Sequence, residues 1–83
     1  MHVSMQVLEF TPAVAGARVG QTVVWTNDDS SPHNVTYVSG PSFKSSGRLE
    51  PGGTFSVKLT SAGTIHYLCT LHPWMKAMLV VSK

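Results

Sequence analysis

Short runs of alternating apolar and polar residues, separated by turn formers, follow one another along the whole chain. Such alternation places every second side chain on one face of a strand. Glycine, proline, asparagine and serine fill most of the intervening segments, and no window shows a sustained 3.6-residue apolar period. We therefore expect an all-β chain without a long helix. The pattern predicts strands at residues 3–7, 22–26, 34–38, 54–59, 64–69 and 77–81.

The spacing of the turns indicates how these strands are arranged. Turn signals recur about every eight to twelve residues, which is typical of a β-sandwich of about seven short strands. The length of 83 residues fits one domain covering residues 1–83. Since a domain this small buries only about 60% of its unfolded surface, a bound metal ion would add usefully to its stability.

Composition and charge exclude several classes of protein. Hydrophobic residues make up 42% of the chain, which is too many for a disordered segment. Six Lys and Arg against four Asp and Glu give a net charge of +2, and the basic residues are scattered, so we expect no nucleic-acid partner. No apolar stretch approaches the roughly 20 residues of a membrane span. No basic region leads into an apolar run at Met1, so we expect either a cytoplasmic protein or one whose signal peptide has been removed. A single cysteine cannot form an internal disulfide, so Cys69 is a core filler, a reactive thiol or a metal ligand.

The densest group of chemically active side chains lies in the segment 69–75, which reads CTLHPWM. Cys69, His72 and Met75 are three residues apart between two predicted strands, so we expect them on one tight loop. Far upstream, His33 stands at the start of another predicted strand. Two imidazoles, one thiolate and one thioether are the donor set of a blue-copper electron-transfer site. The sequence therefore predicts that these four residues hold one copper ion, alternating between Cu(I) and Cu(II).

Other interpretations of these residues remain open. Taken singly, the cysteine and the methionine would more often be core fillers, and the histidines would more often be surface or turn residues. The spacing of all four residues together favours a metal site. Zinc is less favoured because zinc sites rarely use methionine. No acid–base pair or nucleophile motif appears, and Leu68 and Thr70 stand where a multicopper oxidase needs histidines, so we expect no enzyme. A copper storage or delivery module is the alternative to an electron carrier.

Strand parity indicates which donors are buried. Cys69 shares its inward parity with Ile65 and Tyr67, so its sulfur should face the core, whereas His66 should face solvent. His33 should be covered by its own loop. His72 lies beside an apolar group that could serve as a partner-docking patch or merely cover the core. That group consists of Leu71, Pro73 and Trp74.

Several segments resemble, in the same order along the chain, blocks of a known family, the cupredoxins or type 1 blue copper proteins. The segments are residues 10–12, 19–27, 32–35, 49–52, 63–64 and 67–69. The similarity covers nearly the whole chain, and the loop after Cys69 is as short as in the amicyanins, whereas plastocyanins have longer loops. Leu71, Trp74 and Ala77 depart from the amicyanin pattern but leave the four ligand positions intact.

The resemblance implies a Greek-key β-sandwich that carries single electrons between redox proteins, for example a c-type cytochrome or a dehydrogenase. It further implies a monomer that works in the periplasm or another extracytoplasmic space. It also implies that the Asn34 backbone N–H faces the Cys69 sulfur while its side chain ties the two ligand segments together through Thr70. On the residues alone, Asn34 is equally well a turn residue. Pro32 and Pro73 restrict the backbone beside the two histidines, as a preformed site requires.

Overall fold

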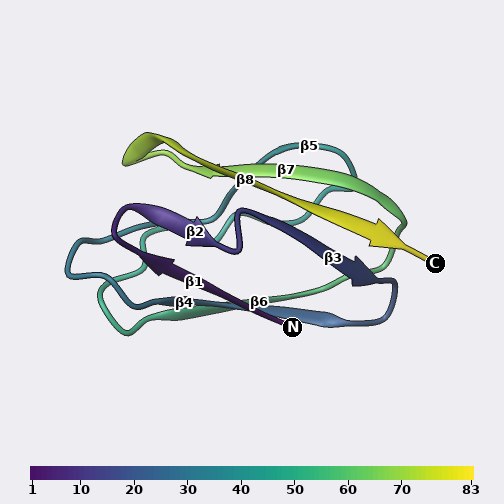
Figure 1. Cartoon of the computed structure of the whole chain (residues 1–83), viewed down its shortest axis with the longest axis horizontal. Helices are drawn as coiled ribbons and strands as arrows, with labels where there is room; N and C mark the ends of the chain where they lie inside the picture. Colours follow the sequence, from purple (N-terminus) through teal and green to yellow (C-terminus); the bar gives the residue numbers. More distant parts are fainter.

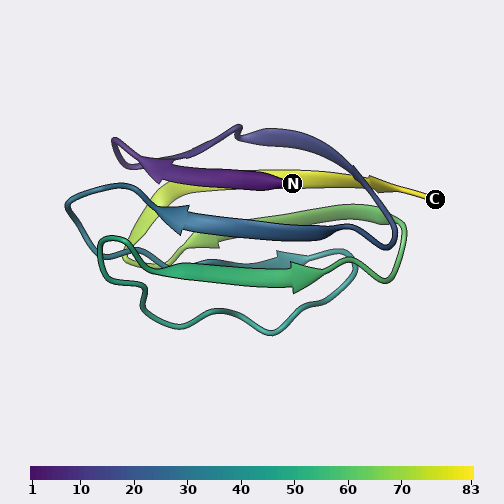
Figure 2. The same cartoon turned by 90° about the horizontal axis from the view of Figure 1, so that it is seen from below.

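The structure, a computed structural model, describes all 83 residues and contains eight β-strands. They form two four-stranded sheets that face each other, as Figure 2 shows from below. No helix suited to crossing a membrane is present. The strands, labelled in Figure 1, are β1 (His2–Gln6), β2 (Glu9–Thr11), β3 (Val14–Arg18), β4 (Thr22–Asn27), β5 (Thr36–Ser39), β6 (Thr54–Lys58), β7 (Gly63–Cys69) and β8 (His72–Ser82).

Strand order confirms the all-β, Greek-key sandwich expected from the sequence. One sheet has the order β2-β1-β4-β6 and the other the order β3-β8-β7-β5. Successive strands from β3 to β7 alternate between the two sheets, so the connections pass over the ends of the sandwich. Two of the pairings, β1 with β4 and β3 with β8, are parallel, and the others are antiparallel.

The structure has eight strands, whereas the sequence predicted a sandwich of about seven and located six of them; β2 and β3 were not located because they carry little strand signal. β2 has three residues, and β3 reads Val-Ala-Gly-Ala-Arg, in which only Val14 favours a strand intrinsically. Pairing with β8 holds β3 in place. The predicted strand 3–7 is also too long, because Val7 lies in the turn between β1 and β2.

Two other predicted boundaries are wrong at the end of the molecule that carries the candidate ligands. The strand predicted at 34–38 begins only at Thr36, because the N–H groups of Asn34 and Val35 donate to the side chains of Cys69 and Ser46 instead of a neighbouring strand. The strand predicted at 77–81 begins at His72.

The predicted loop 69–75 is therefore a two-residue turn followed at once by β8. Cys69 pairs directly with His72, and the register shifts between Leu68 and Cys69. Such an irregularity bends a strand and redirects its side chains. Pro73 is tolerated in β8 because β3 pairs with this strand only from Met78 onward, so the missing N–H lies where β8 has a free edge.

The core lies between the sheets and leads directly to the candidate ligands. Ile65, Tyr67 and Cys69 alternate inward along β7, and His66 faces outward, as the parity of this strand predicted. Trp25 is fully buried and meets Tyr67 edge to face, with ring centroids 5.5 Å apart. Burial raises the pKa of Tyr67 to about 12, so its phenol stays neutral at ordinary pH. Each fully buried large side chain contributes about 1.5–3 kcal/mol to the stability of the fold. The buried Trp25 and Tyr67 therefore hold β7, and with it Cys69, in a fixed position.

Four connections meet at one end of the sandwich, which we call the loop end. They are the β1–β2 turn, the segment 28–35, the segment 47–53 and the β7–β8 turn, all at the left of Figures 1 and 2. Hydrogen bonds join them. The Leu8 N–H in the β1–β2 turn donates to the Asp29 side chain, and the Thr70 N–H in the β7–β8 turn donates to the Asn34 side chain. His33 and Leu49 exchange backbone bonds in an isolated bridge. Because these hydrogen bonds connect the segments of the loop end, each segment restrains the position of the others.

Candidate metal centre

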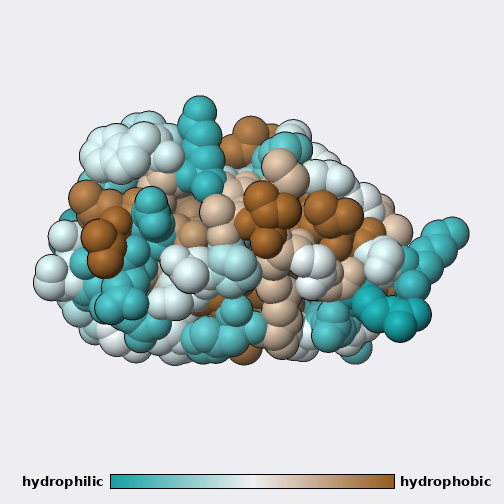
Figure 3. Space-filling model, viewed as in Figure 1, coloured by the Kyte–Doolittle hydropathy of each residue, from teal (hydrophilic) through white to brown (hydrophobic).

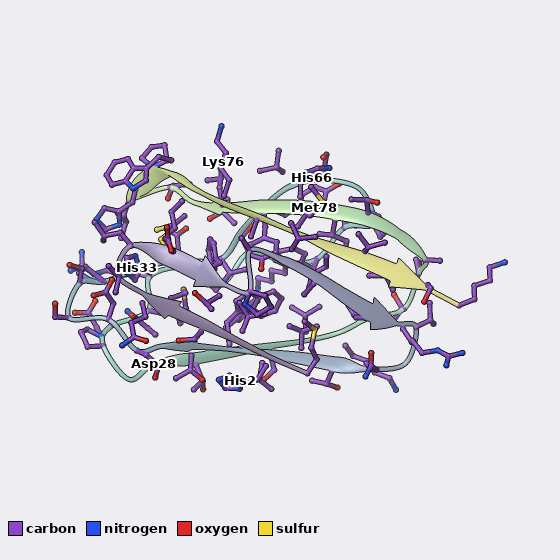
Figure 4. All side chains as sticks on the ribbon, viewed as in Figure 1. His2, Asp28, His33, His66, Lys76 and Met78 are labelled. Atoms are coloured by element: carbon purple, nitrogen blue, oxygen red, sulfur yellow. The ribbon has the colours of Figure 1, made fainter.

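His33, Cys69 and His72 converge at the loop end. The Cys69 Sγ lies 3.7 Å from the His33 Nδ1 and 3.9 Å from the His72 Nδ1, and the two Nδ1 atoms are 3.2 Å apart. His33 and Cys69 are fully buried, whereas His72 is half-buried. The other histidines, His2 and His66, lie along the body of the sandwich away from His33 (Figure 4). The fold thus brings together three donors from two segments of the chain that are far apart in sequence, the segment before β5 and the β7–β8 turn.

The spacing of these donors fits a transition-metal ion. Metal–nitrogen bonds of about 2.0 Å and metal–sulfur bonds of about 2.3 Å place the donors of one ion roughly 3–4 Å apart. All three separations fall in that range. Imidazole nitrogen combined with a thiolate sulfur suits copper in both of its oxidation states. The residues present therefore fit a bound copper ion.

Met75 lies on the inner face of β8. Burial alternates along this strand, and Met75, Ala77 and Leu79 all point into the sandwich. The Met75 side chain is only 2% exposed, so it faces the same interior as Cys69. A thioether in this position would be a weak and long ligand.

Asn34 joins the two segments that carry the donors. Its backbone N–H donates to the Cys69 Sγ at 3.4 Å, and its side-chain amide donates to the Thr70 hydroxyl at 2.7 Å. The Thr70 N–H donates back to the Asn34 Oδ1 at 3.0 Å. Both contacts implied by the resemblance are present. A donor on the sulfur withdraws electron density from a thiolate, which favours the reduced metal.

Asp29 takes part in the site although nothing in the sequence singled it out. Its Oδ2 accepts hydrogen bonds from the His33 Nε2 and from the Leu8 backbone N–H, each at 3.0 Å. Together with a bond from the Ser30 N–H, and with His33 contributing most, they lower the pKa of Asp29 to about 2. The carboxylate is therefore charged at neutral pH. Because the His33 Nε2 donates to it, the Nδ1 keeps the lone pair that faces Cys69 and His72.

Asp29→Asn is expected to raise the reduction potential and to weaken Cu(II) binding about 10- to 100-fold. The negative charge makes the His33 imidazole a stronger donor, which stabilises Cu(II); the amide keeps the shape and an acceptor oxygen but lacks the charge. Asp28→Asn is the matched control, because Asp28 bonds to the Ser4 hydroxyl instead. Voltammetry and a copper competition titration give both quantities. Equal potentials in the two variants would contradict this role for Asp29.

An apolar rim surrounds the half-buried His72. Trp74 is 65% exposed and Leu71 44% exposed, and Pro73 between them is also exposed. The Trp74 ring meets the His72 imidazole edge on, with centroids 5.4 Å apart. Pro32, next to His33, is half-buried. The rim residues therefore cover little of the core and are available to a partner.

Comparison with known proteins identifies the family. Residues 1–82 match the family described as copper binding proteins, plastocyanin/azurin family. The chain belongs to this family. It is a cupredoxin, and its cofactor is copper.

Individual relatives extend the comparison. This cupredoxin is 37% identical over 83 residues to amicyanin-alpha of Methylorubrum extorquens, a match that covers 96% of the chain and 70% of that protein. It is 37% identical over 67 residues to amicyanin of Paracoccus denitrificans, covering 77% of the chain but only 51% of that relative. A solved structure, the novel purple cupredoxin from Nitrosopumilus maritimus, superposes with a TM-score of 0.89 at 28% identity over 98% of both chains.

Proposed function

We propose that this cupredoxin is a small one-electron carrier. His33, Cys69 and His72 would supply the strong ligands of the copper, and Met75 would supply a weak thioether ligand. The observation that carries the proposal is the triangle of one sulfur and two Nδ1 atoms, with sides of 3.2–3.9 Å, at the end of a rigid sandwich. A copper ion in this donor set cycles between Cu(I) and Cu(II).

The protein's own contribution is to hold the donors still. Asn34 ties the segment before β5 to the β7–β8 turn, and Asp29 fixes the ring of His33. Pro32 and Pro73 restrict the backbone beside the two histidines. Because the donors are fixed by such contacts, both oxidation states meet nearly the same geometry, and little reorganisation accompanies electron transfer.

Electrons enter and leave through His72. It is the half-buried member of the donor triangle, whereas Cys69 and His33 are fully covered. The exposed rim of Leu71, Pro73 and Trp74 then forms the contact with redox proteins, such as a c-type cytochrome or a dehydrogenase. A small apolar rim gives a weak and short-lived interface, as a carrier needs. The kinship with amicyanins and plastocyanins supports this role for a monomer in the periplasm or another extracytoplasmic space.

Copper storage or delivery is the alternative function. A site that hands over its metal needs open and exchangeable ligands, whereas Cys69 is fully buried here. Repeated reduction and reoxidation of the copper-loaded protein, with the copper content measured after each cycle, separates the two functions. A carrier keeps one copper per chain through reversible cycles. Loss of the metal on reduction would favour delivery.

Met75→Gln is expected to lower the reduction potential while copper stays bound. An amide oxygen is a harder donor than a thioether, so it stabilises Cu(II). We expect a shift of at least about 59 mV, which corresponds to a tenfold change for one electron. Met78→Gln is the control, because Met78 is half-buried on the outer face of β8, opposite His66. Voltammetry showing an unchanged or raised potential in Met75→Gln would argue against Met75 as a ligand of the copper.

A further inference from the structure

One row of side chains crosses the outer face of the sheet β3-β8-β7-β5. His66 on β7 is paired with Met78 on β8, and these are the two central strands of the sheet. Ser39 on β5 continues the row beyond His66, and Val14 on β3 continues it beyond Met78. The fold therefore places an imidazole and a thioether side by side, on a part of the molecule that the copper centre does not use.

The pairing of the two strands brings both donors within reach of one ion. Directly opposed residues of antiparallel strands have Cβ atoms about 4.5–5.5 Å apart. A metal ion bound in line between a nitrogen at about 2.0 Å and a sulfur at about 2.3 Å holds these two atoms roughly 4 Å apart. His66 is exposed and Met78 is half-buried, and Figure 4 shows the two residues next to each other. Rotation of the side chains is therefore enough to bring both donors onto one ion, without movement of the strands.

The surroundings of this pair contain apolar side chains but no carboxylate. Val14, beside Met78, is 62% exposed, and Val80, two residues further along β8, is 46% exposed. Figure 3 shows hydrophobic side chains over β3 and β8. None of the four strands of this sheet contains Asp or Glu. An ion bound at this pair would therefore have imidazole and thioether ligands and no carboxylate ligand from the sheet.

One positive charge lies close to the pair. Lys76 stands two residues before Met78 on the same face of β8, and together with His66 it lines a hollow of about 340 Å³. The hollow leaves the imidazole accessible to an ion from solution. The ammonium group repels cations, and it repels a divalent ion twice as strongly as a monovalent one. The position therefore favours a singly charged ion.

The donor set selects a soft ion. Ca²⁺ and Mg²⁺ require oxygen ligands, which this sheet does not supply as carboxylates. Zinc takes four ligands and rarely uses methionine. Cu(I) prefers soft sulfur donors, combines them readily with imidazole and carries a single charge. Of these ions, Cu(I) is the one that fits both the donors and the charge of the surroundings.

We propose that His66 and Met78 form a second metal site, which binds one Cu(I) ion on the outer face of the sheet. The site is separate from the copper centre, because His66 lies three residues from Cys69 along β7, and Met78 lies three residues from Met75 along β8. At about 3.3 Å per residue, these separations amount to roughly 10 Å. This cupredoxin would thus hold a second cuprous ion while the first stays in place. The inference does not depend on the proposed function as an electron carrier.

Titration of the reduced, copper-loaded protein with further Cu(I) tests the proposal. The titration is anaerobic, and a coloured chelator specific for Cu(I) measures the free ion. We expect the parent to bind two Cu(I) per chain, one in each site. Calorimetry with Zn(II) in place of the second Cu(I) should show no binding. A parent that binds only one Cu(I), or that binds Zn(II) as tightly as the second Cu(I), would overturn the proposal.

Two substitutions remove one donor each. Met78→Leu nearly conserves the side-chain volume, and His66→Gln changes an exposed residue, so both variants should fold. Each should lose the second Cu(I) and keep the first. His2→Gln is the matched control, because His2 is also an exposed strand histidine but has Val24 as its neighbour on β4. If the second Cu(I) persists in Met78→Leu or His66→Gln, or disappears in His2→Gln, the assignment is wrong.

Nuclear magnetic resonance identifies the sulfur that binds the ion. The chain has four methionines, Met1, Met5, Met75 and Met78, and labelling their methyl groups with ¹³C gives one signal for each. Cu(I) is diamagnetic, so all four signals are observable in the reduced protein. The second Cu(I) should shift the Met78 methyl signal and leave the Met75 signal in place. A shift at Met1 instead of Met78 would contradict the proposed site.

Lys76→Gln is expected to tighten binding of the second Cu(I) by up to about fivefold, because it removes the repulsion between the ammonium group and the ion. Lys58→Gln is the matched control, since Lys58 lies on β6 in the other sheet and should not affect the affinity. The chelator titration measures both dissociation constants. Equal affinities in the two variants would place the ion away from Lys76 and would count against the pair of His66 and Met78.

Discussion

Cys69→Ser is expected to remove the intense visible absorption of the copper-loaded protein almost completely. This absorption arises from charge transfer between a thiolate and Cu(II), and Cys69 is the only thiol in the chain. Serine offers a harder oxygen that stays protonated, so it cannot replace the thiolate as a donor. Titration with Cu(II), followed by absorption, should saturate at one equivalent in the parent and give almost no colour in the variant.

Thr70→Ser is the matched control for this experiment. Thr70 is adjacent to Cys69 and accepts the Asn34 side-chain bond through its hydroxyl, which serine retains. We therefore expect full colour in Thr70→Ser. Circular dichroism checks that both variants keep the sandwich. Intense colour in a folded Cys69→Ser protein would contradict the assignment of the ligand.

Copper is expected to stabilise the fold strongly. The proposed ligands come from the segment before β5, from β7 and from β8, so unfolding disperses them and releases the metal. A ligand present at 1,000 times its dissociation constant adds about 4 kcal/mol to the free energy of unfolding. For a domain of this size, that corresponds to a melting temperature roughly 15–30 °C higher.

Scanning calorimetry of the apo and copper-loaded proteins measures this difference. Cys69→Ser with the same amount of copper is the control, and its melting temperature should change little on adding the metal. Coincident melting temperatures of the parent with and without bound copper would show that the native state has no preferential affinity for it.

Alternation predicted the strands well where one face is buried, and poorly elsewhere. In β7 the buried Ile65, Tyr67 and Cys69 gave a clear period of two. β3 lies at a sheet edge and contains two alanines and a glycine, so its conformation depends on pairing with β8 and not on its own residues. Val7 continues the apolar–polar alternation of β1 in the sequence, but the chain turns at this residue. No local propensity of Val7 indicates a turn.

The sequence predicted those residues of the candidate site whose types and spacing are rare, and it missed the residue whose type is common in turns. A cysteine, a histidine and a methionine at three-residue spacing are rare, and they indicated the donor cluster directly. Asp29 stands four residues before His33 in a segment of turn formers, where a carboxylate is ordinary.

The electron paramagnetic resonance spectrum of the protein loaded with one equivalent of Cu(II) shows whether the Cys69 thiolate binds the copper. A buried Cys69 thiolate that shares the copper with His33 and His72 spreads the unpaired spin onto sulfur. We therefore expect an intensely blue sample with a narrow copper hyperfine splitting and one copper per chain. A pale sample with a wide splitting, as oxygen and nitrogen ligands alone produce, would contradict it.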